Sequence, residues 1–187
     1  MYHSGGVTRR PPPFPVLPPA AVSAAPGRSY KYYDGSVGEP LISFGEGQSF
    51  STFAVACAGG LSPDRATVDI LCNVSNIAGP DGDEVLMAFH RPSAGVVGLV
   101  GGCHPLPLQA LVGFERVTVA AGGRGSVALS LPVSSALVFV NEVGASALYE
   151  GLHFIDISNG NGANQTFAIE VATTAVVRTP PLPLAAY

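Results

Sequence analysis

Three acidic side chains lie within four residues of the chain, at Asp81, Asp83 and Glu84. Paired carboxylates can act as a general acid and base, and a loop of carboxylates can bind calcium. A calcium loop needs further oxygen ligands at regular spacing, and no such series follows Glu84. Asp81-Gly82-Asp83 is typical of a turn, because glycine tolerates a positive φ and aspartate hydrogen-bonds to nearby backbone. We therefore predict a turn here, with no catalytic role.

Cysteine and histidine offer the other candidate ligands. Cys103-His104 has no second pair of ligands at the spacing of a zinc site. His90 and His153 fall within strand patterns, so we expect them near the surface, exposed or hydrogen-bonded. Residues 95–102 are rich in glycine but lack GxGxxG and the lysine of a phosphate-binding loop, which predicts a flexible connection. The sequence thus predicts no metal ion and no cofactor.

Two triplets match the acceptor sequence for N-linked glycosylation, Asn73-Val74-Ser75 and Asn164-Gln165-Thr166. Asn73 falls on the polar face of a predicted strand, where a modifying enzyme could reach it. Glycosylation also requires the secretory route. Asn73 and Asn164 are therefore candidate sites only if the chain takes that route.

The cysteines Cys57, Cys72 and Cys103 are odd in number, so they cannot all pair within one chain. Cys72 lies on the apolar face of a predicted strand, where a free cysteine packs as a small apolar residue. A disulfide between Cys57 and Cys72 across neighbouring strands is the alternative. The sequence leaves both open.

Short strands dominate the predicted secondary structure. Val68, Ile70, Cys72 and Val74 alternate with mostly polar residues, which indicates a strand with one buried face. In the next strand we predict Val85, Met87 and Phe89 inside and Leu86, Ala88 and His90 outside, with Arg91-Pro92 as its end. Further strands are predicted over 114–119, 127–131, 136–140, 152–157 and 166–171, with Val117, Val127 and Leu129 also inside. This pattern favours an all-β, antiparallel sandwich of the immunoglobulin or fibronectin type III kind.

Composition narrows the class of partner. A chain of 187 residues with 47% hydrophobic content suits one domain with a real core. A net charge of −4 and the lack of a basic stripe argue against nucleic acid as a partner. No apolar run approaches the ~18 residues of a membrane-spanning helix. The charged fraction of 12% is low, which indicates that something else covers part of the surface.

Proline marks both ends of the chain. The cluster Pro11-Pro12-Pro13 favours extended polyproline structure, typical of a linker or of a ligand for a proline-reading domain. We divide the chain into a proline-rich and aromatic linker (1–49), the sandwich (50–173) and a proline-rich tail (174–187). The first six residues lack the basic start and apolar run of a signal peptide. We expect residues 1 to about 40 to be loosely held and the aromatic side chains of Tyr30, Tyr32, Tyr33 and Phe44 to be left uncovered.

Several motifs in a fixed order carry a family resemblance. They are Pro26-Gly27-Arg28-Ser29-Tyr30, Phe44-Gly45-Glu46-Gly47-Gln48-Ser49-Phe50, Gly82-Asp83-Glu84-Val85 and Gly113-Phe114-Glu115-Arg116. Together they resemble the last linker and the C-terminal fibronectin type III-like domain of glycoside hydrolase family 3, the β-glucosidases and β-xylosidases. Glu46, Gln48 and Phe50 depart from the usual residues of that pattern.

The resemblance implies an accessory domain that packs on the catalytic domains of an enzyme hydrolysing O-glycosyl bonds. Such enzymes need a nucleophile carboxylate and an acid/base carboxyl, which in this family lie in domains that the chain does not cover. No activity is therefore expected from the chain alone, and the Gly82–Val85 and Gly113–Arg116 motifs would be structural. The family's enzymes are secreted or sent to cell walls and vacuoles. The alternatives are one portion of a divided hydrolase, or a stand-alone adhesion sandwich that contacts protein or glycan through its loops.

Overall fold

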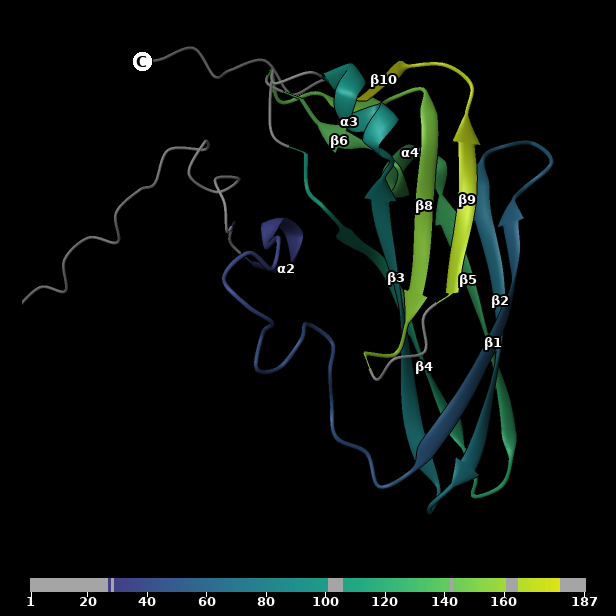
Figure 1. The fold of residues 1–187 in the computed structure, drawn as a ribbon. Coiled ribbons are helices and arrows are strands. Elements are labelled where there is room, and N and C mark those ends of the chain that lie inside the picture. The colour runs from purple at the N-terminus through teal and green to yellow at the C-terminus, as the bar shows by residue number, and fades with distance from the viewer. Residues whose placement is uncertain (1–26, 28, 101–105, 142, 161–164, 179–187) are drawn as a thin grey trace, which may run out of the picture.

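The computed structural model describes residues 27, 29–100, 106–141, 143–160 and 165–178. Two antiparallel sheets pack face to face (Figure 1). One sheet has the order β1-β2-β5, formed by Thr52–Leu61, Thr67–Ala78 and Arg124–Pro132. The other has the order β4-β3-β8-β9, formed by Ala110–Val119, Gly82–Pro92, Gly151–Ser158 and Gln165–Val171. The prediction of an all-β antiparallel sandwich is confirmed.

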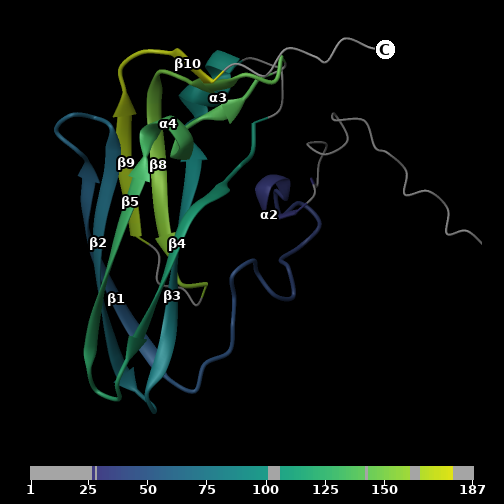
Figure 2. The ribbon, with the colours of Figure 1, turned by 180° about the vertical axis from the view of Figure 1, so that it is seen from behind.

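Small elements close one end of the sandwich. They are the helices α3 (Ala94–Val100) and α4 (Val133–Ala136) and a third sheet of β10 (Ala175–Arg178), β7 (Ser146–Leu148) and β6 (Phe139–Val140). A short helix, α2 (Ser29–Tyr32), lies beside β3 and β4 in both views (Figure 2). No helix in the described ranges is long and apolar enough to cross a membrane.

Four local predictions are wrong. The turn expected at Asp81-Gly82-Asp83 lies before Gly82, because strand β3 already begins at that residue. The predicted loop after Pro92 contains helix α3, which Ser93 begins by accepting a hydrogen bond from the amide of Val96 on its Oγ. The strand predicted over 136–140 starts only at Phe139, because helix α4 ends at Ala136. The predicted tail begins with strand β10, which pairs with β7.

The core lies between the two sheets. The inner face of β2 contributes Val68, Ile70, Cys72 and Val74, all fully or almost fully buried, as the alternation predicted. Val127 and Leu129 of β5 lie beside them in the same sheet. Ile155, Ile157 and Ile169 pack against them from the other sheet. Val117 is half-buried against this core. Burial of branched side chains on both inner faces is the main stabilising term of such a fold.

The prediction of which β3 side chains point into the core between the sheets is wrong. Leu86 and Ala88 are fully buried in the core between the sheets, whereas Val85, Met87 and Phe89 face outward. Met87 and Phe89 are nevertheless buried, because the segment before β1 covers the outer face of β3. A strand covered on both faces shows no apolar–polar alternation, so its pattern does not tell inside from outside.

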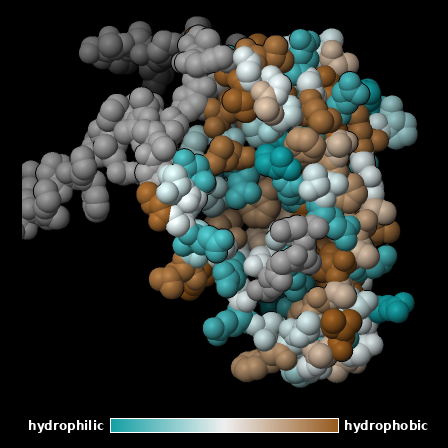
Figure 3. All heavy atoms as spheres, viewed as in Figure 1, coloured by the Kyte–Doolittle hydropathy of each residue, from teal (hydrophilic) through white to brown (hydrophobic). Residues whose placement is uncertain are grey.

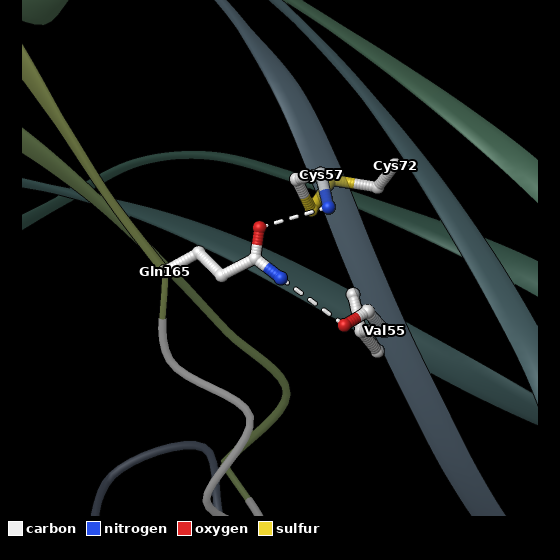
Figure 4. Close-up of a disulfide and its surroundings, with 4 residues drawn as sticks. All are labelled: Val55, Cys57, Cys72 and Gln165. Carbon is white, nitrogen blue, oxygen red and sulfur yellow. Dashed lines mark hydrogen bonds between the residues drawn. A yellow bond between two sulfur atoms is a disulfide. The ribbon is translucent and has the colours of Figure 1, made fainter.

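A disulfide joins β1 to β2 (Figure 4). Cys57 and Cys72 are direct cross-strand partners, with their Cα atoms 4.0 Å apart. The amide of Cys57 points away from β2, toward Gln165. The two cysteines therefore form a non-hydrogen-bonded pair, the position at which antiparallel strands bring side chains closest. Of the two arrangements that the sequence left open for Cys72, the structure has the bridge.

Candidate docking surface

An aromatic cluster fixes the segment before β1 to the sandwich. The rings of Tyr30 and Phe44 stack with their centroids 4.0 Å apart, and each meets Phe89 of β3 edge-on at 6.1 Å. The amide of Leu111 donates to the Tyr30 hydroxyl (3.2 Å), and the amide of Leu108 donates to the carbonyl of Lys31 (2.7 Å). Tyr30 and Tyr33 are half-buried. Contrary to the prediction of a loosely held segment, α2 is thus anchored to the outer face of the four-stranded sheet.

Beyond this anchor the segment exposes its apolar side chains. Leu41 and Phe50 are 99% and 97% exposed, and Val37 and Ile42 are also mostly in solvent. A hollow of about 620 Å³ is lined by Ser29, Tyr30, Tyr33, Pro40, Ile42 and Phe44. Figure 3 shows hydrophobic residues at the margin where this segment stands out from the sheets. We call Val37, Leu41 and Ile42 the apolar ridge. Such clustering of exposed apolar side chains marks interaction surfaces.

A polar cleft opens where the segment enters β1. It has a volume of about 700 Å³ and is lined by residues 47–53 with Glu84 and Asn159. The Glu84 carboxylate is buried; its Oε2 accepts from the Asn159 amide (3.0 Å) and its Oε1 from the backbone amide of Val85 (2.9 Å). A buried carboxylate is tolerated when hydrogen-bond donors satisfy it. Glu84 is therefore held by β3 and by the end of β8, with one face toward the cleft.

The Gly82–Val85 and Gly113–Arg116 motifs lie side by side on the paired strands β3 and β4. The Asp83 carboxylate bonds the hydroxyl of Thr118, its direct cross-strand partner, and the guanidinium of Arg116. These bonds, the Thr118 bond above all, hold the pKa of Asp83 below its usual value. Such a carboxylate stays ionised and paired, as a structural cross-strand contact requires.

Residues of the Gly113–Arg116 motif lie on both faces of β4. A Cβ at Gly113 would lie 2.6 Å from Cδ2 of Leu131, so glycine lets the two sheets approach closely there. Phe114 and Glu115 are exposed, and Phe114 pairs with Met87 on the outer face that carries the apolar ridge.

The expectation that His90 and His153 lie near the surface is wrong, because both are fully buried. Nε2 of His153 lies 2.8 Å from the carbonyl oxygen of Tyr149 and must donate to it, which leaves Nδ1 to accept from Nε2 of His90 at 2.9 Å. Burial lowers the pKa of His90 to about 3, and it also lowers the pKa of His153. The pair is therefore neutral and structural at pH 7, and the strand pattern gave no sign of it.

The remaining candidates are placed as follows. Asn73 lies exposed on the outer face of β2. Asn164 and Cys103-His104 lie outside the described residues, as do residues 1–26 and 179–187. Among the described residues, no group of three or more histidine, cysteine, aspartate or glutamate side chains could hold a metal ion.

The known proteins that this chain matches carry the names of β-glucosidases and β-xylosidases. No family model matches the chain. The probable β-glucosidase J of Aspergillus fumigatus is 28% identical over 156 residues, which cover 79% of this chain and 18% of that protein. The probable exo-1,4-β-xylosidase xlnD of Aspergillus japonicus is 26% identical over 165 residues, covering 76% and 19%. The chain thus spans about a fifth of the length of these relatives.

A solved structure agrees on the fold. The β-glucosidase 3B of Thermotoga neapolitana matches with a TM-score of 0.64 and 23% identity, over 78% of this chain and 19% of that one. The class of protein is therefore an antiparallel β-sandwich found within larger β-glucosidases. The resemblance to the β-glucosidases and β-xylosidases of glycoside hydrolase family 3 is confirmed.

Proposed function

We propose that this chain is a non-catalytic, fibronectin type III-like accessory domain that docks on the catalytic domains of a family 3 glycoside hydrolase. The single observation that carries the proposal is the apolar ridge. Leu41 and its neighbours are held out in solvent by a segment that Tyr30 and Phe44 anchor to β3. Exposed apolar side chains on an anchored segment favour association with another protein surface.

Two further features support this proposal. The chain matches only about a fifth of each relative, which leaves room for catalytic domains elsewhere in such enzymes. The carboxylates of the Gly82–Val85 motif are also engaged within the sandwich, Asp83 by Thr118 and Arg116, and Glu84 by Asn159. Neither is placed as the free pair that a glycosidase needs.

A chimera tests the docking role. The matching part of the Aspergillus fumigatus enzyme is replaced by this whole chain, and hydrolysis of an aryl β-glucoside and the melting temperature are measured. A Leu41→Ser/Ile42→Ser variant should lower both, because polar side chains weaken an apolar contact. Leu71→Ser is the matched control, since Leu71 is 53% exposed on the opposite sheet. Equal activity and stability in the ridge variant and the control would contradict the proposal.

The absence of catalysis is tested separately on the chain alone. We expect no turnover of aryl β-glucosides or β-xylosides above background. Turnover that disappears in Asp83→Ala or Glu84→Ala would overturn the non-catalytic assignment.

The polar cleft favours a second candidate, a stand-alone sandwich that binds glycan. A carboxylate and an amide, Glu84 and Asn159, lie beside the exposed ring of Phe50. Such groups can bond sugar hydroxyls while the ring packs on the apolar face of a sugar. Titration with gluco- and xylo-oligosaccharides, followed by NMR, should shift the Phe50 and Asn159 resonances; unchanged spectra would remove this candidate.

A further inference from the structure

Asn73 stands apart from the other asparagines of the described chain. Nδ2 of Asn76 donates to the carbonyl of Pro80, Oδ1 of Asn141 accepts from two backbone amides, and Nδ2 of Asn159 donates to Glu84. The Asn73 carboxamide makes no hydrogen bond within the ranges that the structure describes, and it is exposed. Its amide nitrogen is therefore not committed to holding the fold.

The acceptor triplet has the right geometry on the folded strand. Successive residues of a strand point to opposite faces, so Asn73 and Ser75 share the outer face of β2 while Val74 is fully buried between the sheets. The cross-strand partners of Asn73 are Ala56 on β1 and Ser126 on β5. Both side chains are small, so neither crowds a group attached to Asn73.

The surface beside Asn73 is hollowed. A depression of about 410 Å³ is lined by Ala54, Val55, Ala56, Asn73, Ser75 and Arg124. The Ser75 hydroxyl and the Arg124 guanidinium can donate hydrogen bonds to a sugar ring there. On the same strand, Leu71 is 53% exposed and Ile77 is largely in solvent. A first sugar at Asn73 therefore fits the surface and shields neighbouring apolar side chains.

An independent feature points to the compartment in which such a modification occurs. The residue before Asn73 is Cys72, which is bonded to Cys57. Disulfides form and persist in oxidising compartments such as the endoplasmic reticulum and the exterior of the cell. Asparagine-linked glycosylation takes place on the same route. The disulfide thus favours the same compartment as the acceptor triplet requires.

The position is also compatible with docking. Asn73 lies on the outer face of the three-stranded sheet, whereas Tyr30 and Phe44 cover the outer face of the four-stranded sheet. Figure 1 shows the β1-β2-β5 sheet on the side away from α2. A glycan at Asn73 would leave the apolar ridge free for a partner.

We propose that Asn73 carries an N-linked glycan. In the transfer, Nδ2 forms a bond to C1 of the first sugar of an oligosaccharide carried on a polyprenyl diphosphate. The bond from C1 to the diphosphate oxygen breaks, the amide nitrogen loses one proton, and the polyprenyl diphosphate leaves. No oxidant or reductant takes part. The proposal does not depend on what the sandwich docks to.

Secretion of the whole chain from a eukaryotic host behind an added leader tests the proposal. In an Asn164→Gln background, peptide mass spectrometry after peptide N-glycosidase treatment should find Asn73 converted to aspartate. Asn73→Gln and Ser75→Ala should abolish the glycan-dependent shift in gel mobility, whereas Ser75→Thr should keep it. The retained hydroxyl explains the difference, because the acceptor sequence accepts serine or threonine at this position.

One result would overturn the proposal. It is an unmodified Asn73 peptide from secreted protein in which the Cys57–Cys72 disulfide has formed. Because the readout is the wild-type peptide in the Asn164→Gln background, a substitution that prevents secretion does not remove the test. Loss of docking in the chimera would leave this result unchanged, so the two proposals fail separately.

Discussion

The side chain of Gln165 in β9 forms hydrogen bonds with the backbone of β1 on either side of Ala56. Its bond to Cys57 joins the edge strand of one sheet to the edge strand of the other. Its Oε1 accepts from the amide of Cys57 (2.8 Å), and its Nε2 donates to the carbonyl of Val55 (3.1 Å) (Figure 4). One carboxamide thus makes the two bonds that a residue of an added strand would make. Since β1 is an edge strand of its sheet, Gln165 also satisfies groups that would otherwise be open to strand addition.

Replacing Gln165 with alanine should lower the free energy of unfolding by about 1–3 kcal/mol, because two half-buried backbone groups lose their partners. Urea unfolding monitored by circular dichroism measures the change. Gln48→Ala is the control, since Gln48 is exposed and should change stability by less than about 0.5 kcal/mol. Equal stability of the two variants would show that water replaces the Gln165 carboxamide without cost.

Removing the disulfide should cost about 3 kcal/mol, because the bridge restricts the unfolded chain over a sequence separation of 15 residues. The comparison is Cys57→Ala/Cys72→Ala against its parent, both carrying Cys103→Ala so that no third thiol exchanges. A reducing agent should lower the melting temperature of the parent and leave the double variant unchanged. Three reactive thiols in the oxidised wild-type protein would contradict the bridge.

The His90–His153 pair should make stability depend on pH. The folded pKa of His90, about 3, lies below its unfolded value of 6.5, so the unfolded chain binds more protons between these values. Stability is therefore present above pH 6.5 and is lost as the pH falls toward 3. Between pH 7 and pH 5 the loss from His90 should reach about 2 kcal/mol, at 1.36 kcal/mol for each pKa unit.

Urea unfolding at several pH values measures this dependence. His90→Asn is the comparison, because an amide can donate to Nδ1 of His153 without titrating. The variant should show a shallower slope, with the remainder from His153, whose pKa is also lowered. Asp83 titrates below this window, since its pKa is held under its usual value. Identical slopes would mean that His90 does not remain neutral in the folded protein.

Phe89→Ala should cost about 3 kcal/mol, because the ring is buried between β3 and the anchored segment. It should also release α2, so that the amide of Leu108, which donates to Lys31, exchanges hydrogen faster. Phe114→Ala is the matched control, since Phe114 is mostly exposed on the same face. A loss below about 1 kcal/mol would place Phe89 in solvent.

The sequence predicted β2 and its buried face correctly, since one side of that strand is wet and its residues alternate. It failed at β3, where Val85 to Phe89 are apolar without interruption. Both faces of that strand are covered, one by the opposite sheet and the other by Tyr30 and Phe44. The segment that covers the outer face of β3 is distant in sequence, so the periodicity of residues within the strand does not predict it.

The sequence by itself determined the class of fold, the acceptor triplet at Asn73 and the family resemblance, because each depends on residues close together in the chain. Only the tertiary structure decided the pairing of Cys57 with Cys72, the burial of His90 against His153 and the bond from Gln165 to Cys57. These contacts join residues on different strands. These contacts depend on the register of the strands and on the packing of one sheet against the other, which the local sequence pattern does not predict.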